Sequence, residues 1–421
     1  MTERVHIGLL GFGCIGRATV RAAEAAAPWI EAAGLSFSCE RALVRAVDGK
    51  RAPIPLVDDP EEFLEGRYDV VVEVLGGVEP ARTLVTALLE RGTPVVTANK
   101  SLLAAAGDEL SAAAARGRTS LRYEASALAG VPFIGTFGGR PLARAVDRVA
   151  AILNGTSNYI LSVMEADRLS FSDALGRAQT LGLAEPDPSA DIQGRDAAEK
   201  LVLLLRHLGI ASIDRDAIET SGIGGIETRD LEVARQFGGR LKPVVHASIT
   251  TGAIEAFVGP AFLDGSNALS SVDGALNGIR LDGRFVRGLF FAGPGAGPDV
   301  TAATILDDVV ETVSEKANRV ASGFSRAKLA VNRAPTTPVA PSARWFLRWS
   351  FPAAAPDWSA FSDLLASHGV WLGRTHAAQE SDGETLWALT QRASRHSIDA
   401  ALRSSAAAGA TRTLAVRALE A

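Results

Sequence analysis

Several carboxylates and one amine are concentrated in a short stretch near the middle of the chain. The stretch reads Glu185-Pro-Asp187-Pro-Ser-Ala-Asp191-Ile-Gln-Gly-Arg-Asp196-Ala-Ala-Glu-Lys200, and an apolar run follows it. Asp196 and Lys200 are four residues apart, so they share one face of the helix that the pattern predicts. Acidic groups beside one amine suit a substrate that carries an ammonium and a hydroxyl group. The alternative is a solvated helix start with an ordinary ion pair, worth only a few tenths of a kcal/mol.

A second lysine follows a predicted strand, in the segment Thr97-Ala-Asn99-Lys100. In sheets of parallel strands, ligands bind at the carboxyl ends of the strands. A lysine can release its proton once its pKa is lowered, whereas an arginine cannot. Lys100 and Lys200 are therefore candidates for proton transfer, and Lys242 and Lys316 are interpreted as ordinary surface residues. The six lysines among the 43 basic residues are Lys50, Lys100, Lys200, Lys242, Lys316 and Lys328.

A glycine-rich turn lies near the start of the sequence, between an apolar strand and an Ala-rich helix. Its residues Gly11-Phe12-Gly13-Cys14-Ile15-Gly16 fit the spacing of a dinucleotide-binding turn. The first glycine permits the tight turn, the second lets the backbone approach a pyrophosphate, and the third lets helix and strand pack closely. The alternative is a plain strand–helix turn. Cys14 is interpreted as a packing residue rather than a redox group.

The end of the second predicted strand bears on the choice between NAD and NADP. An NAD site usually carries Asp or Glu here for the ribose hydroxyls. In this chain the strand end reads Leu43-Val-Arg45-Ala-Val-Asp48. Arg45 is placed to face the extra phosphate of NADP, and Asp48 follows a turn later. NADP is therefore favoured, NAD is the alternative cofactor, and a solvated surface charge is the alternative role of Arg45.

Strands and helices alternate through residues 1–135, which predicts a doubly wound parallel sheet with helices on both faces. The strands are expected at 5–10, 42–47, 69–75 and 94–97. Residues 136–299 predict a mixed α+β domain for substrate binding and dimerisation, with strands at 148–153, 242–250, 253–259, 267–271, 276–281 and 284–291. A helix at 300–317 is expected to pack back on the first domain, which we extend to include about 300–329.

The C-terminal part of the chain is predicted to form a separate unit. Residues 330–342 are rich in proline and predict a semi-rigid linker. Residues 343–421 follow with elements in the order βαββαβ. The tryptophans in this part are predicted to form a small core rather than an interface: Trp345, Trp349, Trp358 and Trp371.

The composition narrows the class of protein. The net charge is −5 and no basic block is present, so we expect no nucleic-acid partner. No segment reaches the roughly 18 apolar residues that span a membrane, and the first residues lack the pattern of a signal peptide. Cys14 and Cys39 are too few for a disulfide framework or a thiolate zinc site. These features predict a cytoplasmic protein that acts on a small molecule.

The stretch from Ala178 to Lys200 resembles the signature of the homoserine dehydrogenases. The matching residues are Ala178, Gly182, Ala184, Asp187, Pro188, Asp191, Ile192, Gly194, Asp196 and Lys200. Further segments resemble this family in the same order: 11–16, 71–77, 97–100 with 124–127, and 152–160. The resemblance covers residues 4–317 and implies a Rossmann-like first domain. It also implies the NAD(P)-dependent interconversion of L-homoserine and L-aspartate 4-semialdehyde, a step in threonine, methionine and isoleucine biosynthesis.

The resemblance also implies roles for individual residues. Lys200 and Lys100 flank the reacting carbon and handle the hydroxyl proton. A free lysine, with a pKa near 10.4, is a poor base at neutral pH, and a second ammonium nearby lowers a lysine pKa. Glu185, Asp191 and Asp196 bind the substrate, and Asp196 also orients Lys200. The resemblance further implies that Gly155 and Thr156 contact the substrate. The residues predicted to contact the cofactor are 11–16, Arg45, Thr97, Asn99 and Lys100.

A monovalent cation, usually sodium, is implied on the backbone near Glu124, Ala127, Ala129 and Val131. Here Ser-Ala-Leu-Ala-Gly at 126–130 replaces the more usual Ser-Val-Ala-Gly-Gly. A homodimer or higher homo-oligomer is expected. The C-terminal unit resembles an ACT domain, a fold that often binds amino acids and pairs with itself. Its usual acidic-Pro-Gly turn is replaced by Phe351-Pro-Ala-Ala-Ala-Pro-Asp357, so a structural role is expected at least as much as effector binding.

Two other functions remain open from the sequence alone. Another nicotinamide-dependent dehydrogenase of similar architecture would share the glycine-rich turn but lack the constellation at 185–200. A catalytically inactive sensor would keep the cofactor site and respond through the C-terminal unit. The presence of both lysines and all three carboxylates argues against the sensor.

Overall fold

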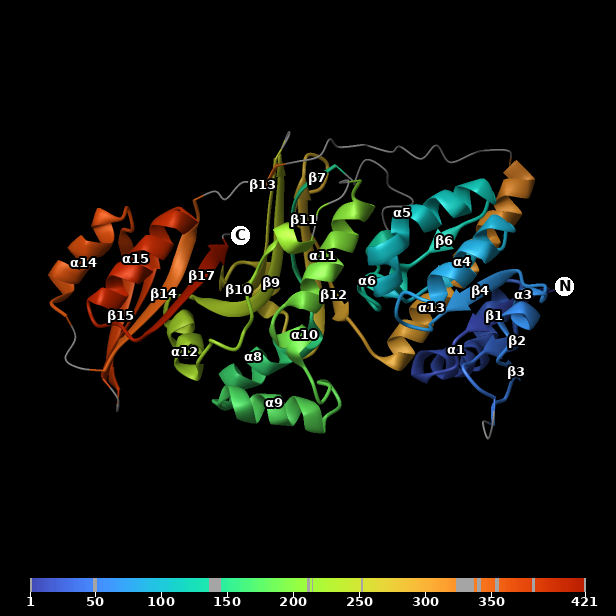
Figure 1. Cartoon of the computed structure of the whole chain (residues 1–421), viewed down its shortest axis with the longest axis horizontal. Coiled ribbons are helices and arrows are strands. Elements are labelled where there is room, and N and C mark those ends of the chain that lie inside the picture. Colours follow the sequence, from blue (N-terminus) through green and yellow to red (C-terminus); the bar gives the residue numbers. More distant parts are fainter. Residues whose placement is uncertain are drawn as a thin grey trace. The chain divides into compact units, whose positions relative to one another are not determined.

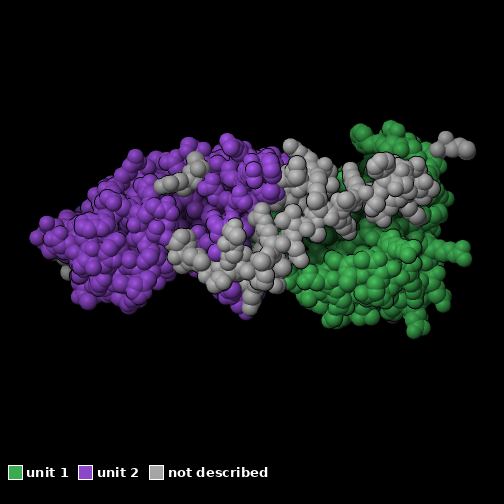
Figure 2. All heavy atoms as spheres, turned by 90° about the horizontal axis from the view of Figure 1, so that it is seen from above, with its two compact units in different colours: residues 1–144, 202–209, 294–332 green, residues 145–201, 210–293, 333–421 purple. Residues whose placement is uncertain are grey.

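The chain folds into two compact units, each with its own sheet, in a computed structural model (Figures 1 and 2). Unit 1 contains residues 1–144, 202–209 and 294–332, and unit 2 contains 145–201, 210–293 and 333–421. The residues that the structure describes are 2–47, 51–135, 145–209, 213, 215–250, 253–322, 337–338, 342–352, 356–380 and 383–419.

Unit 1 is built on a six-stranded parallel sheet in the order β3-β2-β1-β4-β5-β6. The strands are β1 (Glu3–Leu10), β2 (Leu35–Leu43), β3 (Leu56–Val57), β4 (Val70–Glu73), β5 (Val95–Thr97) and β6 (Leu121–Arg122). The chain starts in the middle of this sheet and builds outward in both directions. This order confirms the predicted doubly wound α/β fold.

Helices cover both faces of this sheet because successive residues of a strand point to opposite sides. Val71 of β4 packs in one apolar cluster with α4 and α5, while Val70 and Val72 pack in another with α1 and α13. Ile305 and Val309 of α13 are fully buried in the second cluster. The helices of unit 1 include α1 (Cys14–Ala25), α2 (Ala27–Ala32), α3 (Pro60–Leu64), α4 (Ala81–Glu90), α5 (Lys100–Arg116), α6 (Glu124–Ala127) and α13 (Pro298–Ser322).

The second strand lies earlier in the chain than the predicted 42–47. It pairs with β1 from Glu3 opposite Leu35 to Leu10 opposite Leu43, and its residues Leu35 and Phe37 pack against the sheet core. The apolar residues after Leu43 extended the predicted strand beyond the end of this pairing. Arg45 therefore lies two residues past the strand, where it is exposed.

Unit 2 contains an eleven-stranded mixed sheet in the order β12-β11-β7-β9-β10-β17-β14-β16-β15, with β13 and β8 also paired to β10. Its first strands are β7 (Val146–Ile152), β8 (Glu219–Thr220), β9 (Gly239–Thr250), β10 (Ala253–Asp264), β11 (Leu276–Gly283) and β12 (Leu289–Pro294). Its first helices are α8 (Gly155–Asp167), α9 (Phe171–Thr180), α10 (Ser189–Ile192) and α12 (Thr228–Gln236). The helix α11 (Arg195–His207) begins in unit 2 and ends in unit 1.

One predicted strand of this part, at 267–271, is instead the short 3-10 helix η3 (Ala268–Ser271). Its start is capped by Asn267, whose Oδ1 accepts a hydrogen bond of 3.1 Å from the backbone N–H of Leu269. An Asn cap of this kind competes with extended backbone, and the apolar residues around it had suggested a strand.

The C-terminal elements occur in the predicted βαββαβ order, but their strands continue the eleven-stranded sheet of unit 2, called the central sheet below. They are β14 (Arg344–Phe351), α14 (Trp358–Ser367), β15 (Leu372–Glu380), β16 (Gly383–Thr390), α15 (Arg395–Ala407) and β17 (Arg412–Leu419). β17 pairs in parallel with β10, from Ala261 opposite Arg417 to Leu263 opposite Leu419. Of the predicted linker 330–342, only β13 (Thr337–Pro338) and Ser342 lie within the described residues.

The tryptophan prediction is confirmed for Trp345 and Trp349, which are 1% and 0% exposed, and is wrong for Trp371, which is 57% exposed. Trp371 directly precedes β15 and projects to the solvent. In the part of the chain that the structure describes, every helix is too short or too polar to cross a lipid bilayer.

Candidate active site

The three glycines at the junction of β1 and α1 differ in their steric surroundings. Gly11 has a φ of +105°, which side chains rarely adopt. A Cβ on Gly16 would lie 2.4 Å from the carbonyl oxygen of Gly11, so helix and strand approach too closely for a side chain. A Cβ on Gly13 would meet no atom within 4 Å. Nothing in the described chain requires glycine at position 13, so its open space at the start of α1 fits a pyrophosphate.

Two other residues of the turn region are placed at its surface. Cys14, the first residue of α1, is exposed, so the prediction that it packs is wrong. The helix turns this side chain away from the sheet. Arg45 follows the neighbouring strand β2, and Asp48 lies outside the described residues.

A buried carboxylate joins the carboxyl ends of β4 and β5. Glu73 is 0% exposed, and its Oε2 accepts a hydrogen bond of 2.5 Å from the Thr97 hydroxyl. Its Oε1 accepts from Asn99 Nδ2 at 3.2 Å and from the backbone N–H of Leu75 at 2.8 Å. Burial raises the pKa of Glu73, and these hydrogen bonds oppose the rise.

The same hydrogen-bond network fixes the first turn of α5. Asn99 Oδ1 accepts from the backbone N–H of Leu102 at 3.1 Å and caps the helix, while its Nδ2 also donates to the Gly77 carbonyl at 2.7 Å. Lys100 is the first residue of that helix. Thr97 and Asn99 thus point inward and hold the turn that precedes Lys100. Sequence reasoning gave Glu73 no role, although a charge at the end of the run Val70-Val-Val-Glu73 signals a buried partner.

Asn154 brings together the carboxylates of the segment that the sequence singled out. It is 6% exposed and caps α8 by accepting a hydrogen bond of 2.8 Å from the backbone N–H of Ser157. Its Nδ2 donates to Asp191 at 2.6 Å and to Asp196 at 3.0 Å. The side-chain amide of Asn154 thereby links α8, α10 and α11 to one another. Sequence reasoning did not give Asn154 a role.

Lys200 lies on the same face of α11 as Asp196, as the spacing predicts. Its Nζ is 3.0 Å from Asp196 Oδ2 and donates to the Leu153 carbonyl at 2.8 Å. Both side chains are largely buried, at 13% and 8% exposed. The pair is therefore a shielded ammonium with a fixed direction, not the solvated surface pair that was the alternative interpretation.

The remaining predicted substrate residues lie around this cluster at more open positions. Thr156 donates from Oγ1 to the Leu183 carbonyl at 2.6 Å. Gly155 needs to be glycine because a Cβ there would lie 2.7 Å from the Ala275 carbonyl oxygen. Glu185 is exposed on the loop between α9 and α10. Lys100 belongs to unit 1, and the other predicted substrate residues belong to unit 2.

The predicted cation region is centred on a second buried carboxylate. Glu124 is 7% exposed, and its carboxylate accepts backbone hydrogen bonds from Phe133 and Ile134, both at 2.8 Å, and from Gly135. Burial raises the pKa of Glu124, and these three hydrogen bonds oppose the rise. The backbone N–H of Glu124 donates to Asp308 at 3.0 Å.

The other residues predicted there supply only backbone oxygens. Ala127, Ala129 and Val131 are buried, and Ala129 has a φ of +34°. The Ala129 carbonyl accepts a hydrogen bond of 2.8 Å from the Thr304 hydroxyl. Within the described ranges, no three His, Cys, Asp or Glu side chains are grouped as metal ligands.

Comparisons with known proteins agree with this geometry. The family model for homoserine dehydrogenase matches residues 132–310, and the model for the homoserine dehydrogenase NAD binding domain matches residues 11–124. The chain is 36% identical over 321 residues to the homoserine dehydrogenase of Helicobacter pylori, covering 76% of each protein.

Solved structures give the same result at the level of the fold. A homoserine dehydrogenase from Thiobacillus denitrificans superposes with a TM-score of 0.87 at 31% identity, covering 100% of this chain and 99% of that one. A hyperthermophilic archaeal homoserine dehydrogenase in complex with NADPH superposes with a TM-score of 0.62 at 25% identity, covering 74% and 98%.

The parallel sheet, the glycine turn and the shielded Lys200 define a nicotinamide-dependent oxidoreductase that acts on a CH–OH group. Two family models and a structural similarity over the full length of the chain narrow this class to one family. The chain belongs to the homoserine dehydrogenase family.

Proposed function

We propose that the chain interconverts L-homoserine and L-aspartate 4-semialdehyde, with Lys200 and Lys100 handling the proton. The observation that carries this proposal is the Lys200 amine, held between the Asp196 carboxylate and the Leu153 carbonyl at 3.0 and 2.8 Å. The nicotinamide ring, when bound, supplies or takes up the hydride. In the reducing direction, a protonated lysine donates its proton to the oxygen that becomes the hydroxyl. In the oxidising direction, the lysine takes that proton back.

The carboxylates provide the substrate contacts in this proposal. Asp196 orients Lys200, Asp191 and Glu185 bind the polar groups of homoserine, and Gly155 and Thr156 line the pocket. Asn154 supports this assignment because it holds Asp191 and Asp196 toward one point. The substrate ammonium then meets negative charge, and its hydroxyl meets an amine.

Replacing Lys200 by Ala tests the proton role. We expect turnover with homoserine to fall about 10²- to 10⁴-fold, the usual contribution of a positioned acid or base. Cofactor affinity, measured by fluorescence, stays unchanged. Arg195→Ala is the matched control, because Arg195 is exposed on the first turn of the same helix. Wild-type turnover in Lys200→Ala would rule out the role.

The second proposal concerns the cofactor, for which we propose NADP over NAD. Exposed Arg45, two residues after the strand next to the glycine turn, supports a contact with the extra phosphate. The other proposed contacts come from residues 11–16 and from Thr97, Asn99 and Lys100. A charged hydrogen bond contributes about 1.5–3 kcal/mol, so Arg45→Ala should lower the preference for NADP by roughly 10- to 150-fold. An unchanged ratio of kcat/KM for NADP and NAD would contradict this role.

We further propose a monovalent cation, with sodium expected, on the carbonyls near Glu124, Ala127, Ala129 and Val131. The buried carboxyl groups of Glu124 and Asp308 support this, because burial raises the pKa of both groups and a cation on the neighbouring carbonyls would stabilise their charged forms. Replacing sodium by choline in the assay buffer should lower activity, and adding sodium should restore it. Equal activity in both buffers would count against the site.

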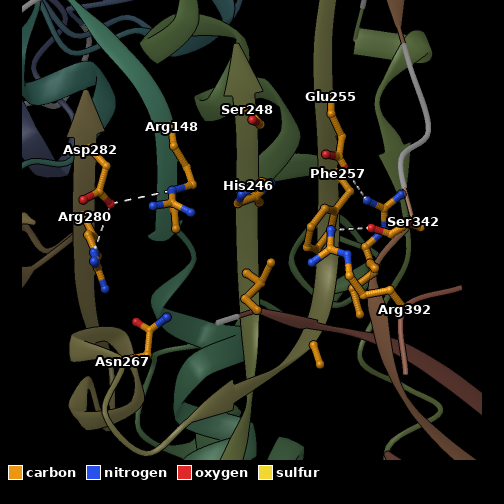
Figure 3. Close-up of a pocket in the computed structure, with 15 residues that line it drawn as sticks. Arg148, His246, Ser248, Glu255, Phe257, Asn267, Arg280, Asp282, Ser342 and Arg392 are labelled. Atoms are coloured by element: carbon orange, nitrogen blue, oxygen red, sulfur yellow. Dashed lines mark hydrogen bonds and ion pairs between the residues drawn. The ribbon is translucent and has the colours of Figure 1, made fainter. Parts of the chain in front are cut away.

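We also propose that the protein forms a homodimer through one face of the central sheet. This face holds a cavity of about 200 Å³, in which Arg148, Glu255 and Asp282 lie on neighbouring strands beside His246 (Figure 3). Charges of both signs suit pairing with a second copy across a two-fold axis. Light scattering should give twice the chain mass, and Arg148→Glu should shift the equilibrium toward monomer. Arg168→Glu, at an exposed position on the end of α8, serves as control.

For residues 343–421 we propose an ACT-like domain with a structural role. The βαββαβ order supports the domain, and the pairing of β17 with β10 supports the structural role. Threonine added to the assay should then leave activity unchanged. Inhibition by millimolar threonine would instead favour effector binding.

A further inference from the structure

The segment Val272–Asn277, which runs from the end of η3 into the first residues of β11, packs against the start of α8. Asn158 Nδ2 donates to the carbonyls of Val272 and Leu276 at 3.0 and 3.1 Å. The backbone N–H of Gly274 donates to Ser162 Oγ at 3.1 Å. The Ala275 carbonyl is the group that excludes a side chain at Gly155. The segment therefore packs along α8, the helix that carries the proposed substrate residues Gly155 and Thr156.

One end of this segment is anchored by a buried lysine. Lys242 of β9 is 1% exposed, and its Nζ donates to the Val272 carbonyl at 2.8 Å and to Asp273 Oδ1 at 2.7 Å. Arg240 donates to the Ser270 carbonyl at 2.7 Å and to Asp273 at 2.9 Å. Burial lowers the pKa of Lys242. The prediction that Lys242 is a surface residue is wrong, because β9 directs it inward toward this segment.

The other end of the segment meets the Lys200 cluster. Asn277 is 1% exposed, and its Nδ2 donates to the Leu153 carbonyl at 3.2 Å. The Lys200 amine donates to the same oxygen at 2.8 Å. One carbonyl oxygen has two lone pairs, so it can accept both hydrogen bonds. The two donors thus define the direction of this carbonyl together.

The side-chain oxygen of Asn277 would make a purely structural role unfavourable in free energy. Its Oδ1 is buried and has no hydrogen-bond partner among the described residues. Leaving a buried acceptor unpaired costs about 1–3 kcal/mol, whereas an apolar residue of similar shape would avoid that cost. A buried polar group with such a cost calls for a functional explanation.

We propose that Asn277 is a positioning residue for Lys200. It acts through the Leu153 carbonyl, which it holds in place so that the Lys200 amine keeps a single direction. The anchoring of the segment by Lys242 fixes Asn277 from the opposite end. This inference rests on the proposed role of Lys200 in proton transfer, and Asn277 itself touches neither substrate nor cofactor.

The test follows the Lys200 amine directly, by NMR of protein labelled with ¹³C at the lysine Cε. Because the chain has only six lysines, the Lys200 signal can be assigned from a Lys200→Arg variant. Asn277→Asp keeps the shape of the side chain, removes the donor to the Leu153 carbonyl and places a carboxylate beside that oxygen. An opposite charge within about 4–6 Å stabilises an ammonium, so the titration midpoint of Lys200 should move to higher pH by about one unit or more.

Asn267→Asp is the matched control, since Asn267 is also a buried asparagine of unit 2 and Asp caps a helix as well as Asn does. It should leave the Lys200 midpoint unchanged. Asn277→Ala should lower kcat about two- to tenfold, the contribution of one neutral hydrogen bond, without changing KM for the cofactor. Thermal melting identifies any variant that fails to fold. If Asn277→Ala does not fold, Asn277→Asp alone decides.

The outcomes separate this inference from the proposed function. An equal Lys200 midpoint in the wild type and in Asn277→Asp overturns the positioning role, whatever the activity of Lys200→Ala. A moved midpoint together with full turnover in Lys200→Ala supports the contact but removes its part in catalysis, which also overturns the inference. A moved midpoint with lost turnover in Lys200→Ala supports both.

Discussion

A methyl group added at Gly13 meets no atom of the described chain within 4 Å, whereas one added at Gly16 lies 2.4 Å from the Gly11 carbonyl oxygen. The two positions are three residues apart in the same turn. Gly13 has a φ of −76°, which any residue adopts. Alanine at Gly13 is therefore compatible with the fold, and its methyl group occupies the space that we assign to the cofactor pyrophosphate.

The magnitudes follow from these contacts. At Gly13, alanine reduces the freedom of the unfolded chain by about 0.4–1 kcal/mol, while its weaker helix capping cancels most of that gain. The free energy of unfolding should stay within about 0.5 kcal/mol of the wild type. Displacing one charged hydrogen bond to the pyrophosphate costs about 1.5–3 kcal/mol, or a roughly 10- to 150-fold weaker affinity. At Gly16, the clash should lower the free energy of unfolding by about 1–3 kcal/mol.

Two measurements on each variant separate these effects. NADPH fluorescence titration gives the affinity, and urea unfolding without cofactor gives the stability. Gly13→Ala should bind weakly and unfold like the wild type, while Gly16→Ala should unfold at lower urea. Wild-type affinity in Gly13→Ala would refute the placement of the pyrophosphate beside Gly13. Strong destabilisation of Gly13→Ala would show that the space there is not open.

Three further predictions concern stability and the substrate site. Burial lowers the pKa of His246 to about 4, below its unfolded value near 6.5. The stability that neutral His246 contributes is therefore present above pH 6.5 and is lost as the pH falls toward 4. Between pH 7 and 5 this loss is about 2 kcal/mol, and His246→Gln should flatten the urea stability profile over that range. Asp230→Ala should destabilise the protein by about 3–5 kcal/mol, because it removes the nearest carboxylate of the buried Arg348, 2.6 Å away, and leaves it with Glu227 at 3.1 Å. Arg229→Ala, at a half-exposed position on the same helix, is the control for the thermal melt. Lys242→Met keeps the volume but releases Val272, so KM for homoserine should rise more than KM for NADP; equal changes would contradict the anchoring of the segment.

The sequence predicts those parts of the fold that depend on neighbours along the chain. Glycine spacing between a strand and a helix requires only local geometry, and Gly11, Gly13 and Gly16 occupy the expected turn. Asp196 and Lys200 meet because four residues bring side chains onto one helix face. The strand–helix alternation of unit 1 predicts a parallel sheet because a helix between two strands returns the chain to the same end of the sheet. For the glycine turn and for Asp196 and Lys200, the partner lies within about one helical turn.

The features that the sequence did not predict depend on residues far apart in the chain. The end of β2 is set by its pairing with β1, not by the apolar residues that follow Leu43. The continuity of the C-terminal strands with the central sheet depends on β10 and β17, about 150 residues apart. No local pattern distinguishes a strand that closes its own small sheet from one that joins another.

Buried polar residues show where a sequence signal exists without its explanation. Glu73, Asn154, Lys242 and Asn277 each stand beside apolar residues, and each is less than 7% exposed. A polar group in such a place needs a partner, so the sequence can mark it as important. The partners are Thr97, Asp191, Asp273 and Leu153, which lie 24 to 124 residues away. The choice of partner requires the tertiary fold, because each partner lies on a different segment that only the packed structure brings close. A polar residue in an apolar run therefore indicates a candidate site residue. Its role can be assigned only once the structure shows which atom it is hydrogen-bonded to.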